Sequence, residues 1–311
     1  MSTLFLTHSD CLNHVTPPGH PERVARLEAI LNRMSEPDFA GLVREDAPRA
    51  TPEAALKAHP QAHLDAIASA APEEGIVSLV ADTLMSPGSL AAALRAVGAA
   101  ERAVDAVLAD EAPNAFCAIR PPGHHAETMT PMGFCLFGTV ALAANHALEA
   151  HGLERGAVID FDVHHGNGTQ DLLWHEPRVR FASTHQMPLY PGTGAPGERG
   201  AHDNVLNVPL APHSGGVAMR SAYADHILPW LDGFAPQLVI VSAGFDAHTR
   251  DPLAQLNWTE DDFAWVTEQI CDLAARHCGG RVVSCLEGGY DLDGLAASVA
   301  AHVTVLMERS A

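Results

Sequence analysis

The sequence predicts a single α/β domain with an open, mostly parallel sheet and helices on both faces. Short, continuously apolar runs rich in β-branched residues alternate with longer alanine-rich helical patterns, which is typical of parallel strands covered on both faces. No Gly/Ser linker, internal repeat or low-complexity tract divides the 311 residues. We therefore expect one domain over 1–311.

Five buried strands are expected from these apolar runs. Each run is short enough for a strand and ends in polar or glycine-rich material. The strands are expected at 114–119 (NAFCAI), 157–162 (AVIDFD), 179–184 (VRFAST), 238–243 (LVIVSA) and 281–286 (RVVSCL).

Four helices are expected around these strands. Ser86 and Pro87 supply a cap and a first-turn proline for one of them. Thr259, with Asp262 three residues later, forms a short-armed capping box for another. The helices are expected at 20–34, 86–110, 259–277 and 291–307.

Composition and charge restrict the function. Hydrophobic residues make up 47% of the chain and aromatic residues only 5%, so the core is expected to consist mainly of Ala, Val, Leu and Ile. The net charge is −20, from 18 Lys+Arg against 38 Asp+Glu. Such a surface repels phosphates and anionic lipids, and we expect neither direct nucleic-acid binding nor membrane binding. It favours cationic ligands weakly.

The cysteines and the chain ends indicate a reducing compartment. None of the six cysteines forms a C-x-x-C pair, and we expect free, mostly buried thiols. The N-terminal stretch lacks the basic and apolar regions of a signal peptide. The late apolar stretch LAASVAAHVTVLM is interrupted by His302 and is too short to span a bilayer. These features predict a cytoplasmic location.

Polar side chains collect where four of the expected strands end. The stretch 160–170, DFDVHHGNGTQ, holds two Asp and two His within six residues. The strand at 114–119 runs into RPPGHHAE, the strand at 238–243 into Asp246, and the last strand into Tyr290. Functional groups of parallel α/β sheets gather beyond the carboxyl ends of the strands, so one site is expected to collect them all.

A divalent metal site is expected at this edge. In a strand, Asp160, Asp162 and His164 would point to one face. Asp162, His164 and Asp246 give two carboxylates and one imidazole, and a catalytic metal usually has three protein ligands and an open position. This set suits Zn²⁺ and also accommodates Fe²⁺, Co²⁺ or Mn²⁺. The alternative is that Asp162 and His164 only cap turns and pair with each other.

The adjacent His124 and His125 are expected to transfer protons beside the metal. Asp160 and Asn167 are the candidate orienting partners. A carboxylate raises the basicity of one imidazole more than a neutral amide raises that of the other, which would separate their roles. The alternatives are a second metal site or two surface histidines.

Tyr290 follows Gly288 and Gly289. A flexible turn would let its hydroxyl reach a carbonyl at the metal and donate a hydrogen bond to a developing oxyanion. The alternative is a tyrosine that only covers the end of the sheet.

Together these motifs resemble the histone deacetylase family, which has the arginase/deacetylase fold. HHGNGTQ and GFDA are similar to the class II branch and its bacterial relatives, which include acetylpolyamine amidohydrolases. The matching motifs, in family order, are HPERVARL (20–27), RPPGHHAE, GFCLFG, DFDVHHGNGTQ, SAGFDAHTRDPL and EGGYDL (287–292).

The resemblance implies a role for each candidate residue. His125 matches the general base, Tyr290 the residue that polarises the acetyl carbonyl, and Asp160 the partner of His124. Asn167 stands where other branches carry Asp. The implied zinc ligands are Asp162, His164 and Asp246, and the implied structural K⁺ site comprises Asp160 and Ser183 with backbone oxygens of Asp162, His164 and Thr184.

The resemblance also implies a channel for an acylated side chain. Phe134 matches one wall, and Tyr190 stands where the family usually carries Phe, which adds a polar group. Asp82 resembles the carboxylate at the rim that holds the substrate backbone. Gly133, Leu253, Gly288 and Gly289 are the other expected channel residues.

The sequence thus predicts a zinc-dependent deacetylase that removes acetyl or other acyl groups from acetyl-lysine in proteins or peptides. A deacetylase of acetylpolyamines or other small amides is the alternative. It ranks second because polyamine enzymes of the family narrow the channel by dimerisation through an inserted loop, and no long insertion is evident between 60 and 115. A third alternative is an acetyl-lysine binder without turnover, but such a protein needs no base or oxyanion donor. A fourth is arginase-type hydrolysis, but the second set of metal-bridging carboxylates that it needs is not found in the sequence. The oligomeric state is left open, with a homodimer and a homotetramer both considered.

Overall fold

Eight parallel strands form the centre of the structure, a computed structural model that describes residues 2–310. They lie in the order β2-β1-β5-β10-β9-β6-β7-β8, and β3 and β4 form a separate antiparallel pair. The ends of the predicted 1–311 domain, Met1 and Ala311, lie outside the described residues. The strands are β1 (Leu4–Thr7), β2 (Val43–Asp46), β3 (Val77–Ser78), β4 (Leu84–Met85), β5 (Asn114–Cys117), β6 (Gly156–Asp160), β7 (Val179–Gln186), β8 (Val205–Leu210), β9 (Leu238–Ala243) and β10 (Val282–Leu286).

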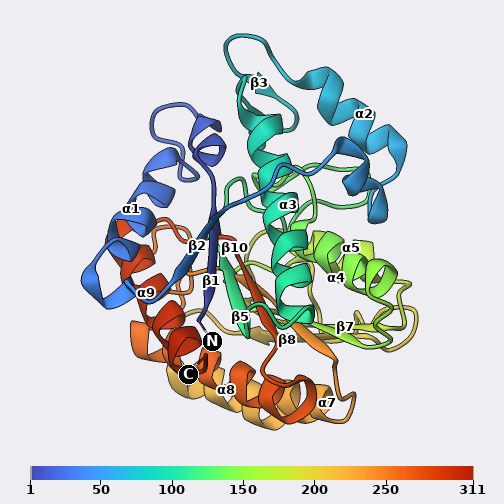
Figure 1. Cartoon of the computed structure of the whole chain (residues 1–311), viewed down its shortest axis with the longest axis vertical. Helices are drawn as coiled ribbons and strands as arrows, with labels where there is room; N and C mark the ends of the chain where they lie inside the picture. Colours follow the sequence, from blue (N-terminus) through green and yellow to red (C-terminus); the bar gives the residue numbers. More distant parts are fainter. Residues whose placement is uncertain (1, 311) are drawn as a thin grey trace.

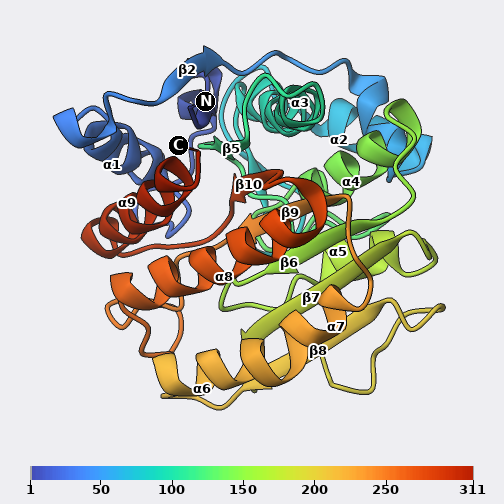
Figure 2. The same ribbon diagram turned by 60° about the horizontal axis from the view of Figure 1, so that its bottom comes forward.

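Helices cover both faces of the sheet, as Figures 1 and 2 show. One face is covered by α1, α8 and α9, and the other by α3 and α4. The predicted fold class, a single α/β domain with a mostly parallel sheet, is confirmed. The helices are α1 (Val24–Met34), α2 (Gln61–Ala70), α3 (Ser89–Leu108), α4 (Thr139–Ala150), α5 (Asn167–Leu173), α6 (Gly216–Ala222), α7 (Leu228–Asp232), α8 (Glu260–Cys278) and α9 (Leu292–Glu308).

The strand predicted at 157–162 ends two residues early, and this shapes the site. β6 stops at Asp160, whose Oδ1 accepts a hydrogen bond from the backbone N of Asp162 at 3.1 Å. Asp162 repeats the pattern, because its Oδ1 accepts from the backbone N of His164 at 2.9 Å. These local bonds compete with the sheet ladder and turn the chain. The strand alternation expected for Asp160, Asp162 and His164 is therefore wrong, although all three remain buried.

The helix predicted at 86–110 begins at Ser89, with Gly88 as its N-cap, so the expected cap at Ser86 is wrong. Ser86 has other partners. Its backbone N donates to Oγ of Ser89 at 2.7 Å, and its own hydroxyl accepts from the backbone N of Val15 at 2.9 Å. The capping box at Thr259 is found, since Asp262 accepts a hydrogen bond from the backbone N of Thr259 at 2.9 Å.

Several elements were not predicted. β2 has the sequence VRED and lies at the edge of the sheet with mostly exposed side chains, so it has no apolar run to identify it. The apolar pattern of β8 is interrupted by Asn207 and Pro209. Helices α2, α4, α5, α6 and α7 were also missed.

The two faces of the sheet carry different cores. Buried alanines of α3 and α4 dominate one cluster, whereas the other is rich in phenylalanine and includes Phe116, Phe161, Phe245 and Phe263. The expected core of Ala, Val, Leu and Ile thus describes only one face. All six cysteines are free and buried, as expected.

His302 lies among these phenylalanines and makes folding stability sensitive to acid. Its Nδ1 lies 2.7 Å from Oγ1 of Thr267 and its Nε2 2.9 Å from Oγ of Ser284. The Thr267 hydroxyl donates to a backbone carbonyl, so it accepts from Nδ1 of His302. Burial lowers the pKa of His302 from 6.5 to about 3. The histidine is therefore neutral when folded, while the unfolded chain takes up a proton below pH 6.5.

His302→Gln should reduce the loss of stability in acid. In the wild type, the contribution of the neutral His302 to the free energy of unfolding is fully present above pH 6.5 and is lost as the pH falls toward 3. The loss amounts to about 2 kcal/mol at pH 5. Urea unfolding at pH 5 to 8 measures the difference in slope, and exposed His202→Gln is the control. Equal slopes for His302→Gln and the wild type would contradict this assignment.

Candidate active site

The candidate site lies at the carboxyl ends of four neighbouring strands, in the order β5-β10-β9-β6. Their adjacency in the middle of the sheet is visible in Figure 2. His124 and His125 follow β5, and Asp162 and His164 follow β6. The segments after β9 and β10 supply Asp246 and the residues up to Tyr290. The sequence-predicted residues from all four strand ends therefore meet at one edge.

Asp162, His164 and Asp246 form a compact, buried set of three potential metal ligands. Nδ1 of His164 lies 3.1 Å from Oδ1 of Asp162 and 3.1 Å from Oδ2 of Asp246. Two carboxylates and one imidazole at this spacing suit a divalent ion such as Zn²⁺, with a fourth position open. His164 lines the channel described below, which gives that position access.

Backbone donors hold the two carboxylates in place. Oδ2 of Asp162 accepts from the backbone N of Gly288 at 2.8 Å, and Oδ1 of Asp246 accepts from the backbone N of Val163 at 2.9 Å. A Cβ at Gly288 would lie 2.2 Å from Oδ2 of Asp246. Only glycine fits this position, because any side chain would push the carboxylates apart.

The electrostatics of the set favour a bound cation. Burial acts to raise the pKa of Asp162, but the charges of His124 and His164 hold it far below its ordinary value. Burial and the charge of Asp162 raise the pKa of Asp246 to about 7. Burial opposes charge on His164, but hydrogen bonds to Asp162 and Asp246 raise its pKa to about 10. A proton on His164 thus offsets part of the negative charge of the two carboxylates. A divalent metal ion would offset more of it, so the donor set fits such an ion.

The tandem histidines have the partners that the sequence suggested. Nδ1 of His124 lies 3.0 Å from Oδ2 of Asp160, and Nδ1 of His125 lies 2.7 Å from Oδ1 of Asn167. Nδ2 of Asn167 donates to Glu127 at 2.7 Å, which turns the amide oxygen toward His125. His125 therefore carries its proton on Nδ1, and Nε2 keeps its lone pair.

The two histidines differ in proton affinity. Burial lowers the pKa of His124, but the charges of Asp162 and Asp160 raise it well above 6.5. Burial and the charges of His124 and His164 lower the pKa of His125 well below 6.5. Of the two, only His125 lines the channel. The neutral imidazole thus faces the space for a substrate, and the charged one lies behind it.

Tyr290 is fixed from two sides. Its backbone N donates to Oδ2 of Asp251 at 2.7 Å, and the guanidinium of Arg26 lies 4.9 Å from the centre of its ring. Burial raises the pKa of Tyr290 well above its ordinary value, so the hydroxyl keeps its proton. The ring lines the channel next to His164 and His125.

A buried charge cluster supports the loops that carry these residues. Arg26 donates to the carbonyl of Gly289 at 2.5 Å and to the carbonyl of Glu287 at 2.6 Å. Glu22 pairs with both Arg26 and Arg120, and all three side chains are fully buried. The carboxylate of Glu287 accepts from the backbone N of Gly123 at 2.6 Å. The start of α1 is thereby tied to the segments after β5 and β10.

Sequence reasoning assigned no role to Arg26, Asp251 or Glu287. Each lies inside one of the family-like motifs, which are HPERVARL, SAGFDAHTRDPL and EGGYDL. A charged residue at an apolar position of the first helical pattern was the available signal for Arg26.

The channel above the three ligands has a volume of about 230 Å³. The rings of Phe134 and Tyr290 lie 6.0 Å apart, and the ring of Tyr190 lies 5.2 Å from that of His125. Such a narrow, mostly apolar space fits a linear aliphatic chain. The lining residues are Asp82, His125, Gly133, Phe134, His164, Leu189, Tyr190, Leu253 and Tyr290.

Asp82 lines the channel and forms a hydrogen bond to the segment that carries Phe134. Its Oδ1 accepts from the backbone N of Gly133 at 3.2 Å, and Thr83 Oγ1 accepts from the backbone N of Phe134 at 3.1 Å. Gly288 and Gly289 do not contribute to the lining; they contact Asp162 and Arg26 instead. Leu189 is a lining residue that the sequence did not suggest.

The residues expected around a potassium ion lie beneath this site. Asp160 of β6 stands opposite Ser183 of β7 in the sheet register. Oγ of Ser183 lies 2.9 Å from Nδ1 of His185, and Oγ1 of Thr184 lies 3.5 Å from the hydroxyl of Tyr223. The buried Asp160 carboxylate and the Ser183 hydroxyl are thus neighbours, and potassium binding there stays a prediction.

The model of the histone deacetylase domain matches residues 20–306. The chain belongs to the histone deacetylase family. Family membership makes it a hydrolase of the deacetylase or amidohydrolase kind, with acetylated substrates.

Similar proteins occur in bacteria and plants. The uncharacterized protein slr0245 of Synechocystis is 44% identical, over 94% of this chain and 95% of its own length. A histone deacetylase-like amidohydrolase of Pseudomonas aeruginosa is 42% identical over 89% of this chain and 74% of its own. Histone deacetylase 14, chloroplastic, of Arabidopsis thaliana is 40% identical over 98% of this chain and 76% of its own.

The crystal structure of the HDA15 HD domain shares the fold, with a TM-score of 0.93 and 32% sequence identity. The match covers 99% of this chain and 88% of that one. Among the described residues, no helix combines the length and apolar character needed to cross a membrane.

Asp246→Ala should abolish binding of the divalent ion in this site, because it removes one of three ligands and half of the carboxylate charge. Metal content measured by mass spectrometry, with circular dichroism to check folding, tests this. Asp251→Asn is the matched control, a neighbouring buried carboxylate that bonds to backbone N–H groups and should leave metal binding intact. Full occupancy at Asp162 and His164 in Asp246→Ala would contradict the ligand assignment.

Proposed function

We propose that this protein is a zinc-dependent deacetylase that hydrolyses the acetyl amide of acetyl-lysine side chains in peptides or proteins. The observation that carries the proposal is the end of the channel, where His125, Tyr290 and His164, one of the three grouped candidate ligands, face one space. The walls of Phe134 and Tyr190 suit the aliphatic stem of a lysine. A proton acceptor, a hydroxyl donor and a Lewis-acid site around one amide match what amide hydrolysis needs.

Asp162, His164 and Asp246 would hold the zinc ion. When bound, the ion supplies Lewis-acid polarisation of the acetyl carbonyl and makes a water molecule more acidic. His125 takes the proton of the attacking water on Nε2, because its Nδ1 is engaged with Asn167. The same histidine then delivers the proton to the leaving amine. His124, held by Asp160, stays charged behind it and supports negative charge developing on the amide.

Tyr290 donates a hydrogen bond from its hydroxyl to the acetyl oxygen as charge develops there. The contacts with Arg26 and Asp251 hold its ring and backbone, so little reorganisation is needed at that moment. Asp82 supports the rim of the channel through its bond to the backbone N of Gly133, and its carboxylate would accept a hydrogen bond from a substrate backbone N–H. A potassium ion on Asp160 and Ser183 would position the strand end that carries the zinc ligands.

A small acetylated amine, such as an acetylpolyamine, is the second candidate substrate. The acidic net charge of −20 and the polar Tyr190 in the channel wall favour it. The connection between α2 and α3 contains the β3–β4 hairpin and no further helix or strand, and the absence of an inserted dimerisation loop there favours the peptide. A cytoplasmic location stays a prediction, since two similar plant proteins are named chloroplastic, and so does the oligomeric state.

Tyr290→Phe should lower kcat by about a hundred- to a thousandfold, because one oxyanion donor is removed. The ring contact with Arg26 and the backbone bond to Asp251 do not involve the hydroxyl, so fold and metal content should be retained. Steady-state kinetics on an acetyl-lysine peptide, with metal content and melting temperature, measure this. A metal-replete, stable variant with near wild-type kcat would exclude Tyr290 from the mechanism.

The substrate class is tested by comparing kcat/KM for an acetyl-lysine peptide and for acetylputrescine. We expect the peptide to be the better substrate. A preference of tenfold or more for acetylputrescine, about 1.4 kcal/mol in transition-state stabilisation, would reverse the ranking. Binding of the peptide without turnover of either substrate would indicate an acetyl-lysine-binding protein.

A further inference from the structure

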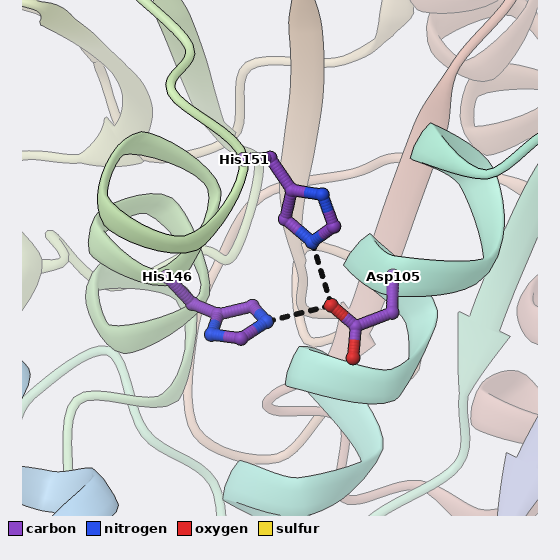
Figure 3. A group of neighbouring side chains, drawn as sticks. All are labelled: Asp105, His146 and His151. Carbon is purple, nitrogen blue, oxygen red and sulfur yellow. Dashed lines mark hydrogen bonds and ion pairs between the residues drawn. The ribbon is translucent and has the colours of Figure 1, made fainter.

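A second group of potential metal ligands lies between α3 and α4. Figure 3 shows Asp105 on α3, His146 on α4 and His151 just after the end of α4. Nε2 of His146 and Nε2 of His151 each lie 2.7 Å from the same atom, Oδ1 of Asp105. Helices α3 and α4 pack against each other, and His151 follows α4 directly, so tertiary structure brings the three side chains together. They lie apart from the channel lining.

The ring of His146 has one nitrogen at Asp105 and the other near a second carboxylate. Its Nδ1 is buried and has no hydrogen-bond partner among the described residues. The carboxylate of Glu101, held by Lys57 at 2.6 Å, approaches this Nδ1 to 3.9 Å. A neutral ring that donates from Nε2 to Asp105 would turn the Nδ1 lone pair toward this second carboxylate. With a cation on Nε2, the proton lies on Nδ1 and faces Glu101, which is the arrangement usual for metal-binding histidines.

The donor set and its accessibility suit a transition ion. Two imidazoles and a carboxylate are typical ligands of Zn²⁺, and also bind Co²⁺ and Ni²⁺. Ligand atoms of a tetrahedral zinc ion lie about 3.3 Å apart, so the atoms now at 2.7 Å must separate by about 0.6 Å. The side chains of His146, His151 and Asp105 are 13%, 29% and 45% exposed, which permits this movement and leaves a side open to water.

We propose that Asp105, His146 and His151 bind a divalent transition ion, with Zn²⁺ as the best match, and that the ion fastens α3 to α4. The role is structural, since α3 packs on β5 and β1 and α4 begins five residues after Phe134 of the channel wall. The proposal does not depend on the proposed function. The competing explanation is a metal-free clasp in which both histidines only donate hydrogen bonds to Asp105.

The test is zinc stoichiometry of the full chain at a buffered, low micromolar concentration of free Zn²⁺. We expect two zinc ions per wild-type chain and one in His146→Gln, His151→Gln and Asp105→Asn. The remaining affinity of the second site should fall at least tenfold in each variant. His277→Gln is the matched control, because it removes a single exposed contact, 2.8 Å long, to Asp232. It should keep two ions.

Co²⁺ substitution adds a readout that stoichiometry lacks. The wild type should show visible d–d absorption from Co²⁺ at two sites. Asp246→Ala should keep only the absorption of the site between α3 and α4, and His151→Gln should lose that same absorption. Circular dichroism establishes that each variant is folded, and Asp105→Asn keeps an oxygen for both histidines if a glutamine variant fails to fold. Equal zinc content in wild type and His151→Gln, or an equal loss of zinc in His277→Gln, would overturn the proposal.

Discussion

Two buried carboxylates, Asp162 and Asp246, flank one imidazole, and much of the structure serves to hold this concentration of negative charge. Buried charges are costly unless they are paired and hydrogen-bonded. The fold supplies backbone N–H donors from Val163 and Gly288, and a glycine where a side chain would force the carboxylates apart. The negative charge that remains is balanced more completely by a divalent ion than by a proton on His164. The same charge polarises its surroundings, because it raises the pKa of His124 while His125, one residue away, stays neutral.

A second buried cluster sets where the reacting groups lie. Glu22, just before α1, pairs with Arg120, which opens the loop of the tandem histidines. It also pairs with Arg26, which binds the backbone before Tyr290. Removing one member of such a cluster leaves an unpaired buried charge, at a cost of about 3–5 kcal/mol. The loops around the site are therefore positioned by charge pairing in the interior, and the channel walls are added above them. An α-helix far from the chemistry in sequence thus contributes to its geometry.

The sequence allowed prediction of the fold class and most of the site, because polar groups at the ends of apolar strands have no packing role. It misplaced the end of β6, since Asp160 and Asp162 bond to the backbone two residues on and turn the chain, which an apolar pattern does not reveal. Edge strand β2 was missed because its side chains face solvent. The sequence also gives no sign of the group of Asp105, His146 and His151. Asp105 and His146 lie on different helices and His151 follows the end of α4, so only helix packing brings them together. The role of Arg26 is likewise defined by tertiary structure, because Arg26 contacts Glu287 and Gly289, more than 260 positions away.

We propose that the carboxylate pair at the edge of the sheet holds a divalent ion which, together with Tyr290, polarises the acetyl group of a substrate in the channel. The most direct measurement is the crystal structure of zinc-loaded Tyr290→Phe with an acetyl-lysine peptide, with anomalous diffraction recorded at the zinc edge. We expect an anomalous peak among Asp162, His164 and Asp246. The lysine stem should lie between Phe134 and Tyr190, with the acetyl oxygen between the ion and residue 290. No peak at those three residues, or a peptide bound with its acetyl group outside the channel, would contradict it.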